Sequence, residues 1–82
     1  MYKVFGKRLR AERKKRELTT QKLAKMCEIS RSYITLIENG KRLPGKKILP
    51  KLAAALEVEA TVVLSWYLED VGQKLHKELK TS

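Results

Sequence analysis

Two helix starts stand close together in the first half of this chain, and their spacing constrains the fold more than any other feature. The segment "ELTTQKLAKMCE" predicts a helix that begins after Thr19 or Thr20, because a threonine hydroxyl can cap the free amides of a first turn. Ser30 can cap a second helix, and Asn39-Gly40 can end it, because glycine tolerates positive φ. Only two or three residues then separate the helices, so they must cross at a steep angle.

The rest of the chain also has apolar residues at helical spacing, and no segment shows the period-two alternation of a strand. Three further helices are expected over about residues 4–16, 46–56 and 60–79, with Gly72 as the weakest point of the last one. The expected fold is therefore all-α with five helices. Residues 1–58 are expected to form the core unit, and residues 59–82 a C-terminal helix that completes the core and mediates dimerisation.

Composition suits one small globular domain. Hydrophobic residues make up 43% of the 82 residues, enough for one modest core. Charges interrupt the apolar stretches, so neither a secretory signal nor a membrane span is expected. Cys27 is the single cysteine, which fits a cytoplasmic protein, and with His76 it leaves too few soft ligands for a metal site. No cofactor and no catalytic arrangement is indicated, so an enzyme is not expected.

The positive charge is concentrated in the first half of the chain. The net charge is +10, and residues 1–47 hold 15 basic and 4 acidic side chains, whereas residues 48–82 hold 4 basic and 5 acidic ones. A surface that served only solubility would spread its charge over both halves. The one-sided distribution instead favours a polyanionic partner, usually nucleic acid. RNA is the weaker choice, because the few aromatic residues do not form a stacking platform.

Residues 18–58 contain three sequence blocks. "LTTQKLA" opens the first of the two closely spaced helices, "SRSYITLIENG" covers the second, and "LPKLAAALEV" forms the helix after them. With these blocks the chain resembles the phage-repressor/Cro-type (Xre-like) helix-turn-helix family. The resemblance implies a bacterial, phage or plasmid regulator of transcription that binds a pseudo-palindromic operator in double-stranded DNA as a homodimer. The alternative is an antitoxin or adaptor whose last helix binds a protein partner, with DNA binding secondary.

Two positions depart from the family pattern. The family usually has Gln at the first position of the first of these helices, where it contacts phosphate; Thr20 stands there and reaches less far. The turn that follows usually holds Gly because its backbone is left-handed, and Glu28 stands there at a cost of about 1 kcal/mol. The resemblance also pairs Glu38 with a basic residue of the N-terminal helix, which falls on Arg13. This ion pair would orient the N-terminal helix against the recognition helix.

The second of the two helices is the recognition helix of the family, and its first turns meet base edges. The residues expected to read bases are Arg31, Ser32, Thr35 and Leu36. Arg31 can donate two hydrogen bonds to guanine, and Leu36 can contact a thymine methyl group. The alternatives are a phosphate contact or a solvated charge for Arg31, and an ordinary exposed leucine for Leu36.

A second group of residues is expected to hold DNA phosphates: Thr20, Ser30, Tyr33, Asn39, Lys41, Arg42 and Lys46. Asn39, Lys41 and Arg42 follow the end of the recognition helix, where backbone amides and charges can hold phosphates. Lys46 adds charge near the start of the next helix. Tyr33 is expected either to place its hydroxyl on a phosphate or to lie half-buried against the preceding helix.

The last predicted helix carries an apolar stripe. Its residues recur at spacings of four, three, four and four, and they are Leu64, Leu68, Val71, Leu75 and Leu79. The first part of the stripe is expected to pack within the protomer, and the later part to serve a homodimer. The residues expected at or near the dimer interface are Val62, Trp66, Leu68, Val71 and Leu75. Two recognition helices about 34 Å apart would discriminate better among DNA sites than one.

Overall fold

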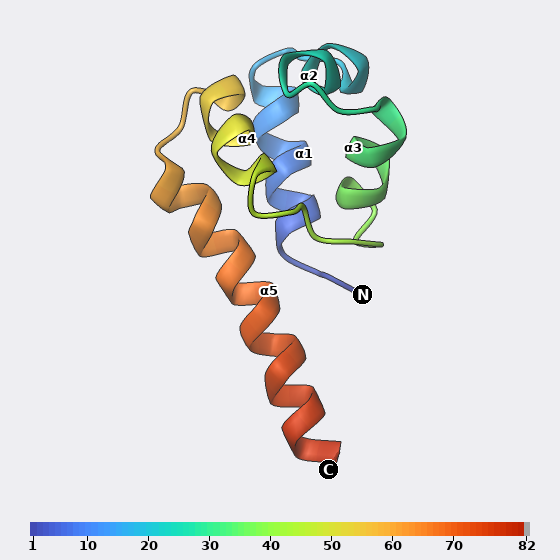
Figure 1. Cartoon of the computed structure of the whole chain (residues 1–82), viewed down its shortest axis with the longest axis vertical. Helices are drawn as coiled ribbons and strands as arrows, with labels where there is room; N and C mark the ends of the chain where they lie inside the picture. Colours follow the sequence, from blue (N-terminus) through green and yellow to red (C-terminus); the bar gives the residue numbers. More distant parts are fainter. Residues whose placement is uncertain (82) are drawn as a thin grey trace.

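Five α-helices make up the structure, a computed structural model that describes residues 1–81 (Figure 1). They are α1 (Phe5–Lys15), α2 (Thr20–Met26), α3 (Arg31–Glu38), α4 (Ile48–Leu56) and α5 (Ala60–Thr81). The all-α fold predicted from the sequence is therefore confirmed. Helices α2, α3 and α4 lie around α1, whereas α5 runs past the start of α1 and extends beyond the other helices (Figure 1). This extension makes the molecule 41 Å long and only 24 by 22 Å across.

Helices α2 and α3 begin at caps that the sequence predicted. The Thr19 hydroxyl oxygen accepts a hydrogen bond from the N–H of Lys22 (3.0 Å), and the Ser30 hydroxyl oxygen accepts one from the N–H of Tyr33 (3.1 Å). Both cap residues have extended backbones, which direct the side-chain oxygen at the free amides of the first turn. The start of each helix is thus specified by a local side chain.

Four helices end in the same backbone motif. One residue with left-handed backbone follows α1, α2, α3 and α4 in turn: Glu17, Glu28, Gly40 and Glu57, with φ between 55° and 73°. At each end, this residue's N–H bonds the carbonyl three residues back, and the next N–H bonds the carbonyl five residues back, at 2.9–3.2 Å. Glu28 has the conformation that the resemblance implied. Glu17 and Glu57 were not expected to share it, because a left-handed non-glycine residue costs about 1 kcal/mol.

Apolar residues compensate this strain. Leu18, Ile29 and Val58 each follow one of the left-handed glutamates, and each is partly buried against the core. The contact between this apolar residue and the end of its helix is a regular part of the motif.

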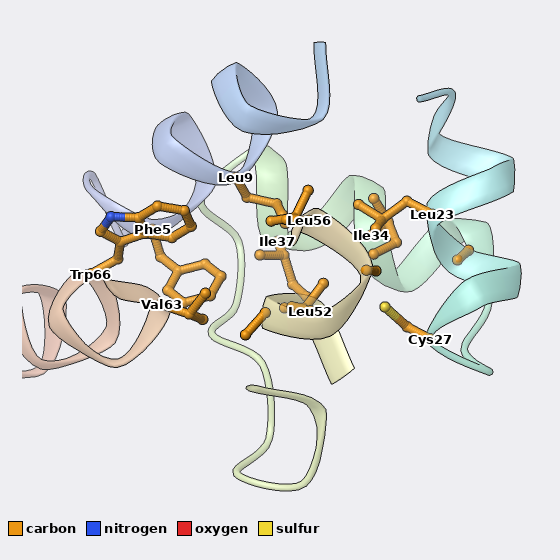
Figure 2. Close-up of a cluster of buried hydrophobic side chains, with 13 residues drawn as sticks. Phe5, Leu9, Leu23, Cys27, Ile34, Ile37, Leu52, Leu56, Val63 and Trp66 are labelled. Carbon is orange, nitrogen blue, oxygen red and sulfur yellow. The ribbon is translucent and has the colours of Figure 1, made fainter. Parts of the chain in front are cut away.

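The core lies among α1, α3, α4 and the first half of α5, with α2 closing one side (Figure 2). Its fully buried members are Phe5, Leu9, Leu23, Cys27, Ile34, Ile37, Leu52, Leu56 and Val63. Trp66, which was expected at or near a dimer interface, instead packs edge-on against Phe5 with ring centroids 5.7 Å apart. Only 8% of Trp66 is exposed, so it is a core residue and not part of an outer surface.

Helix α5 has a buried side and an exposed apolar side. Val63, Trp66 and Asp70 face the core. The predicted stripe lies on a different side and is between 36% and 68% exposed: Leu64, Leu68, Val71, Leu75 and Leu79. The expectation that its first part packs within the protomer is wrong, because the core-facing positions are offset from the stripe. Gly72 does not interrupt the helix. No helix within residues 1–81, α5 included, is long and apolar enough to cross a membrane.

Asp70 joins α5 to the start of α1. Its carboxylate, in a residue that is 3% exposed, accepts hydrogen bonds from the N–H groups of Val4 (3.0 Å) and Phe5 (2.7 Å). Val4 has no side-chain group that could cap α1, so a residue 66 positions later supplies the acceptor. The negative charge also meets the positive end of the helix dipole.

Candidate nucleic-acid interface

Helix α3 presents one side to the core and the other to solvent. Ile34 and Ile37 are fully buried. The residues predicted to read bases are all exposed and lie together on the outer side: Arg31, Ser32, Thr35 and Leu36. The Thr35 hydroxyl donates to the carbonyl oxygen of Arg31 (3.1 Å), so its lone pairs remain able to accept. A cation, two hydroxyls and an apolar side chain suit the acceptors, donors and methyl groups of base edges.

Direct backbone contact with α1 holds the end of α3. A Cβ atom at Gly6 would lie 2.4 Å from the carbonyl oxygen of Ile37 and 2.7 Å from that of Glu38. Any residue other than glycine would therefore push α1 away from α3. Gly6 had no predicted role, although a glycine inside a helical pattern often has a packing reason.

The ion pair implied by the family resemblance is present at the same end of α3. Arg13 donates from Nε to Glu38 Oε2 (2.6 Å) and from Nη2 to Oε1 (3.0 Å). The two side chains are only 11% and 6% exposed. Arg13 also donates from Nη1 to the carbonyl oxygen of Leu18 (2.8 Å). The hydrogen bond to Glu38 raises the pKa of Arg13, so the guanidinium stays charged at this site.

Tyr33 connects α3 to the loop that follows it. Its hydroxyl oxygen accepts a hydrogen bond from the N–H of Gly45 (3.0 Å), and the guanidinium of Arg42 lies 4.5 Å from the centre of its ring. The side chain is half-buried and packs against the core, while its hydroxyl bonds the loop. Tyr33 thus holds Arg42 and the loop at a fixed distance from α3.

The remaining residues predicted to hold phosphates lie around the outer side of α3. Ser30, Asn39, Lys41, Arg42 and Lys46 are exposed, and Thr20 is partly exposed at the first position of α2. Ser30 and Asn39 occupy the two cap positions of α3, so they stand at either end of the proposed reading surface. Lys46 lies in the loop, two residues before α4 begins. The structure therefore brings polar and basic groups to both ends of the recognition helix.

Cys27 has no part in this surface. It is fully buried, and burial raises the pKa of its thiol, which keeps the thiol protonated and weakly reactive. Within the part of the chain that the structure describes, no three His, Cys, Asp or Glu side chains gather closely enough to hold a metal ion.

The chain is similar to known helix-turn-helix proteins. A family model described as helix-turn-helix matches residues 9–63. The HTH-type transcriptional repressor RghR of Bacillus subtilis (strain 168) is 41% identical over 72 residues, which cover 84% of this chain and 53% of RghR. The chain thus spans about half the length of that relative.

Two solved structures are similar in fold as well as in sequence. The restriction-modification controller protein C.AhdI from Aeromonas hydrophila has a TM-score of 0.68 at 36% identity, over 72% of this chain and 89% of that chain. The P22 c2 repressor protein in complex with synthetic operator 9T has a TM-score of 0.70 at 30% identity, over 74% of this chain and 92% of that chain.

Proposed function

The chain belongs to the phage-repressor/Cro-type helix-turn-helix family, and we propose that it represses transcription by binding a specific sequence of double-stranded DNA. One observation carries this proposal: the exposed side of α3 groups Arg31 with two hydroxyls and Leu36, beside the basic turn at Lys41 and Arg42. The net charge of +10 provides the long-range attraction to DNA. A regulator of this kind acts in the cytoplasm of a bacterial cell, where the chromosome lies.

The exposed residues of α3 are proposed to read bases in the major groove. Arg31 would donate to guanine O6 and N7, and Leu36 would contact a thymine methyl group. Ser32 and Thr35 would supply hydroxyl groups that bond either member of a base pair. These side chains share one face of a short helix, so one half-site of a few base pairs would be read.

The groups at the two ends of α3 are proposed to hold phosphates. Lys41, Arg42 and Asn39 would contact one strand after the helix, while Thr20 and Ser30 would contact the backbone near its start. Such contacts fix the position of the protein on the duplex without carrying sequence information. Tyr33 is proposed to act chiefly by holding Arg42.

Selection of binding sites from a library of random duplexes tests this function. We expect the full-length protein to enrich one sequence motif, and we expect binding to weaken steeply with rising salt concentration. Recovery of random sequence at every position would contradict sequence-specific binding. The absence of any retention of duplex DNA would contradict DNA binding altogether.

The apolar side of α5 is proposed to bind the same side of a second copy. Leu68 and Leu75 are 55% and 53% exposed, and Val71 lies between them along the helix. A two-fold dimer would cover this surface in both copies with the same contacts. It would also place two recognition helices on one face of a pseudo-palindromic operator, about 34 Å apart.

Sedimentation of the wild type and two variants tests the dimer. Leu75→Glu is expected to give a folded monomer with much weaker operator binding, because a charge cannot be buried there without a partner. His76→Glu adds the same charge off the stripe and is the matched control, expected to remain dimeric. A wild type that is monomeric both free and on its operator would contradict the dimer. Recovery of a stable complex with a different protein through α5 would favour the adaptor alternative.

A further inference from the structure

A basic groove lies between the C-terminal half of α5 and the N-terminal segment of the chain. Its volume is about 760 Å³, and its charged lining residues are Lys3, Lys41, Asp70, Lys74, Lys77 and Glu78. The N–H of Tyr2 bonds the carbonyl oxygen of Gly40 (2.9 Å), so the N-terminal segment is fixed to the end of the recognition helix. The groove therefore begins where the turn after α3 begins.

The lysines of the groove continue the core-facing side of α5. Lys74 and Lys77 lie four and seven residues after Asp70, which places them above it on the same side of the helix. The exposed apolar stripe lies on another side. Beyond the edge of the core, α5 therefore has an apolar face and a separate basic face. The basic face lines the same groove as the turn after α3.

Lys74 is held in place by the N-terminal segment. Its ammonium donates to the Tyr2 hydroxyl (3.3 Å) and lies 5.6 Å from the centre of the Tyr2 ring. Tyr2 is in turn bonded to Gly40, and the next residue is Lys41. A chain of direct contacts thus sets the distance between the α5 lysine and the turn that is proposed to hold phosphates.

The charge of the groove is positive. Four lysines line it, against two acidic residues, and the Asp70 carboxylate already accepts hydrogen bonds from the N–H groups of Val4 and Phe5. A second hollow shares Tyr2, Lys41 and Lys74 with the groove; Arg42 also lines it, the rest of its lining is aromatic or apolar, and none of it is acidic. The ligand that fits both is an anion, and it must lie next to the end of the recognition helix.

We propose that the groove between α5 and the turn after α3 binds the phosphate backbone of duplex DNA, with Lys74 and Lys77 as phosphate contacts. This inference rests on the proposed function, since Lys41 belongs both to the groove and to the proposed phosphate contacts. DNA is favoured over a small anion because the groove shares Lys41 with the turn that is proposed to hold DNA phosphates. Helix α5 then has two roles, pairing through its apolar face and binding DNA through its basic face.

The test is the salt dependence of binding to a fluorescent duplex of random sequence. Lys74→Gln/Lys77→Gln keeps side-chain length and helix propensity but removes two charges. Binding weakens as salt rises, and each lost phosphate contact makes the slope of log K against log salt less steep by about 0.9. Each lost contact also weakens binding roughly tenfold at about 50 mM salt. For the groove variant, we expect the steepness of this slope to fall by about one to two. Lys25→Gln/Lys51→Gln removes two charges from α2 and α4, outside the groove, and is the matched control.

A variant of opposite sign sharpens the test. Glu78→Gln removes a negative charge from the rim of the groove and is expected to tighten binding to the same duplex. Equal slopes for the groove variant and its matched control would overturn the inference and leave the proposed function standing. A wild type that does not bind the duplex at all would overturn both.

Discussion

Helix α3 is eight residues long and is held along its inner side and at both ends, whereas α5 is 22 residues long and has its buried residues only in its first half. The inner side of α3 is fixed by two buried isoleucines, and its C-terminal end by Gly6 and the Arg13–Glu38 pair. In α5, residues 71–80 are all exposed. The two helices that are proposed to contact other molecules are thus supported in opposite ways.

The difference follows from what each helix is proposed to do. A helix of eight residues is far below the length of roughly 12–15 residues that is marginal in isolation, so α3 exists only because its neighbours hold it. Base reading depends on fixed geometry, and the surrounding helices supply it. The second half of α5 has an apolar face that stays exposed, with Leu75 and Leu79 53% and 68% exposed. This is the expected state of a surface that pairs with another copy.

The contact of α1 with α3 gives the largest expected effect. Gly6→Ala would place a Cβ atom 2.4 Å from a backbone oxygen, so the two helices must separate. We expect the free energy of unfolding to fall by more than about 3 kcal/mol, measured by urea denaturation.

Gly72→Ala is the matched control, because Gly72 lies in the exposed second half of α5. A Cβ atom at Gly72 would meet nothing within 4 Å, and alanine is the better helix former. We expect a gain of about 0.5–1 kcal/mol. Similar losses of stability at Gly6 and Gly72 would contradict the difference in support between the two helices.

The ion pair is expected to show the next largest effect. Glu38→Ala leaves the nearly buried Arg13 charge without its partner and should lower the free energy of unfolding by about 3 kcal/mol. Arg13→Ala should act similarly. The double variant should lose less than the sum of the two, which urea melts of all three would show. Strict additivity would mean that the pair does not act as a unit.

Asp70 tests how the first half of α5 is held. Asp70→Ala leaves the N–H groups of Val4 and Phe5 without acceptors at the buried start of α1. We expect a loss of about 2 kcal/mol. Hydrogen exchange should become faster at the start of α1 and in α5, and unchanged exchange there would argue against this connection.

Tyr33 gives the smallest expected effect on stability. Tyr33→Phe removes the acceptor of the Gly45 N–H but keeps the ring beside Arg42. We expect a loss of about 0.5–1 kcal/mol and faster exchange of the Gly45 amide. A larger loss of stability for Tyr33→Phe than for Asp70→Ala would mean that the loop contact matters more to the fold than the buried carboxylate does.

Local signals in the sequence predicted much of this fold. Thr19, Ser30 and Gly40 act through their own neighbours, so the ends of α2 and α3 could be placed from short stretches of sequence. The resemblance to the repressor family supplied the Arg13–Glu38 pair, which local patterns could not. The exposed side of α3 was likewise predicted from helical spacing.

Contacts between distant residues were missed. The hydrogen bond from the N–H of Phe5 to the Asp70 carboxylate joins residues 65 positions apart, and nothing in either segment alone indicates it. The role of Gly6 was missed for the same reason, because the atoms it contacts are backbone oxygens of another helix. Trp66 was misplaced because helical spacing gives the faces of a helix but not which face the rest of the protein covers.

The central claim is that α3 reads bases while the turn after it holds phosphates, and one measurement separates these roles. Arg31→Ala and Lys41→Ala would each be titrated against the selected operator and against operators changed at single base pairs. We expect Arg31→Ala to lose about 1–3 kcal/mol of binding to the operator and its preference at one base pair of each half-site. Lys41→Ala should weaken binding to every duplex alike and make the slope of log K against log salt less steep by about 0.9. Identical specificity profiles for the two variants would contradict the account.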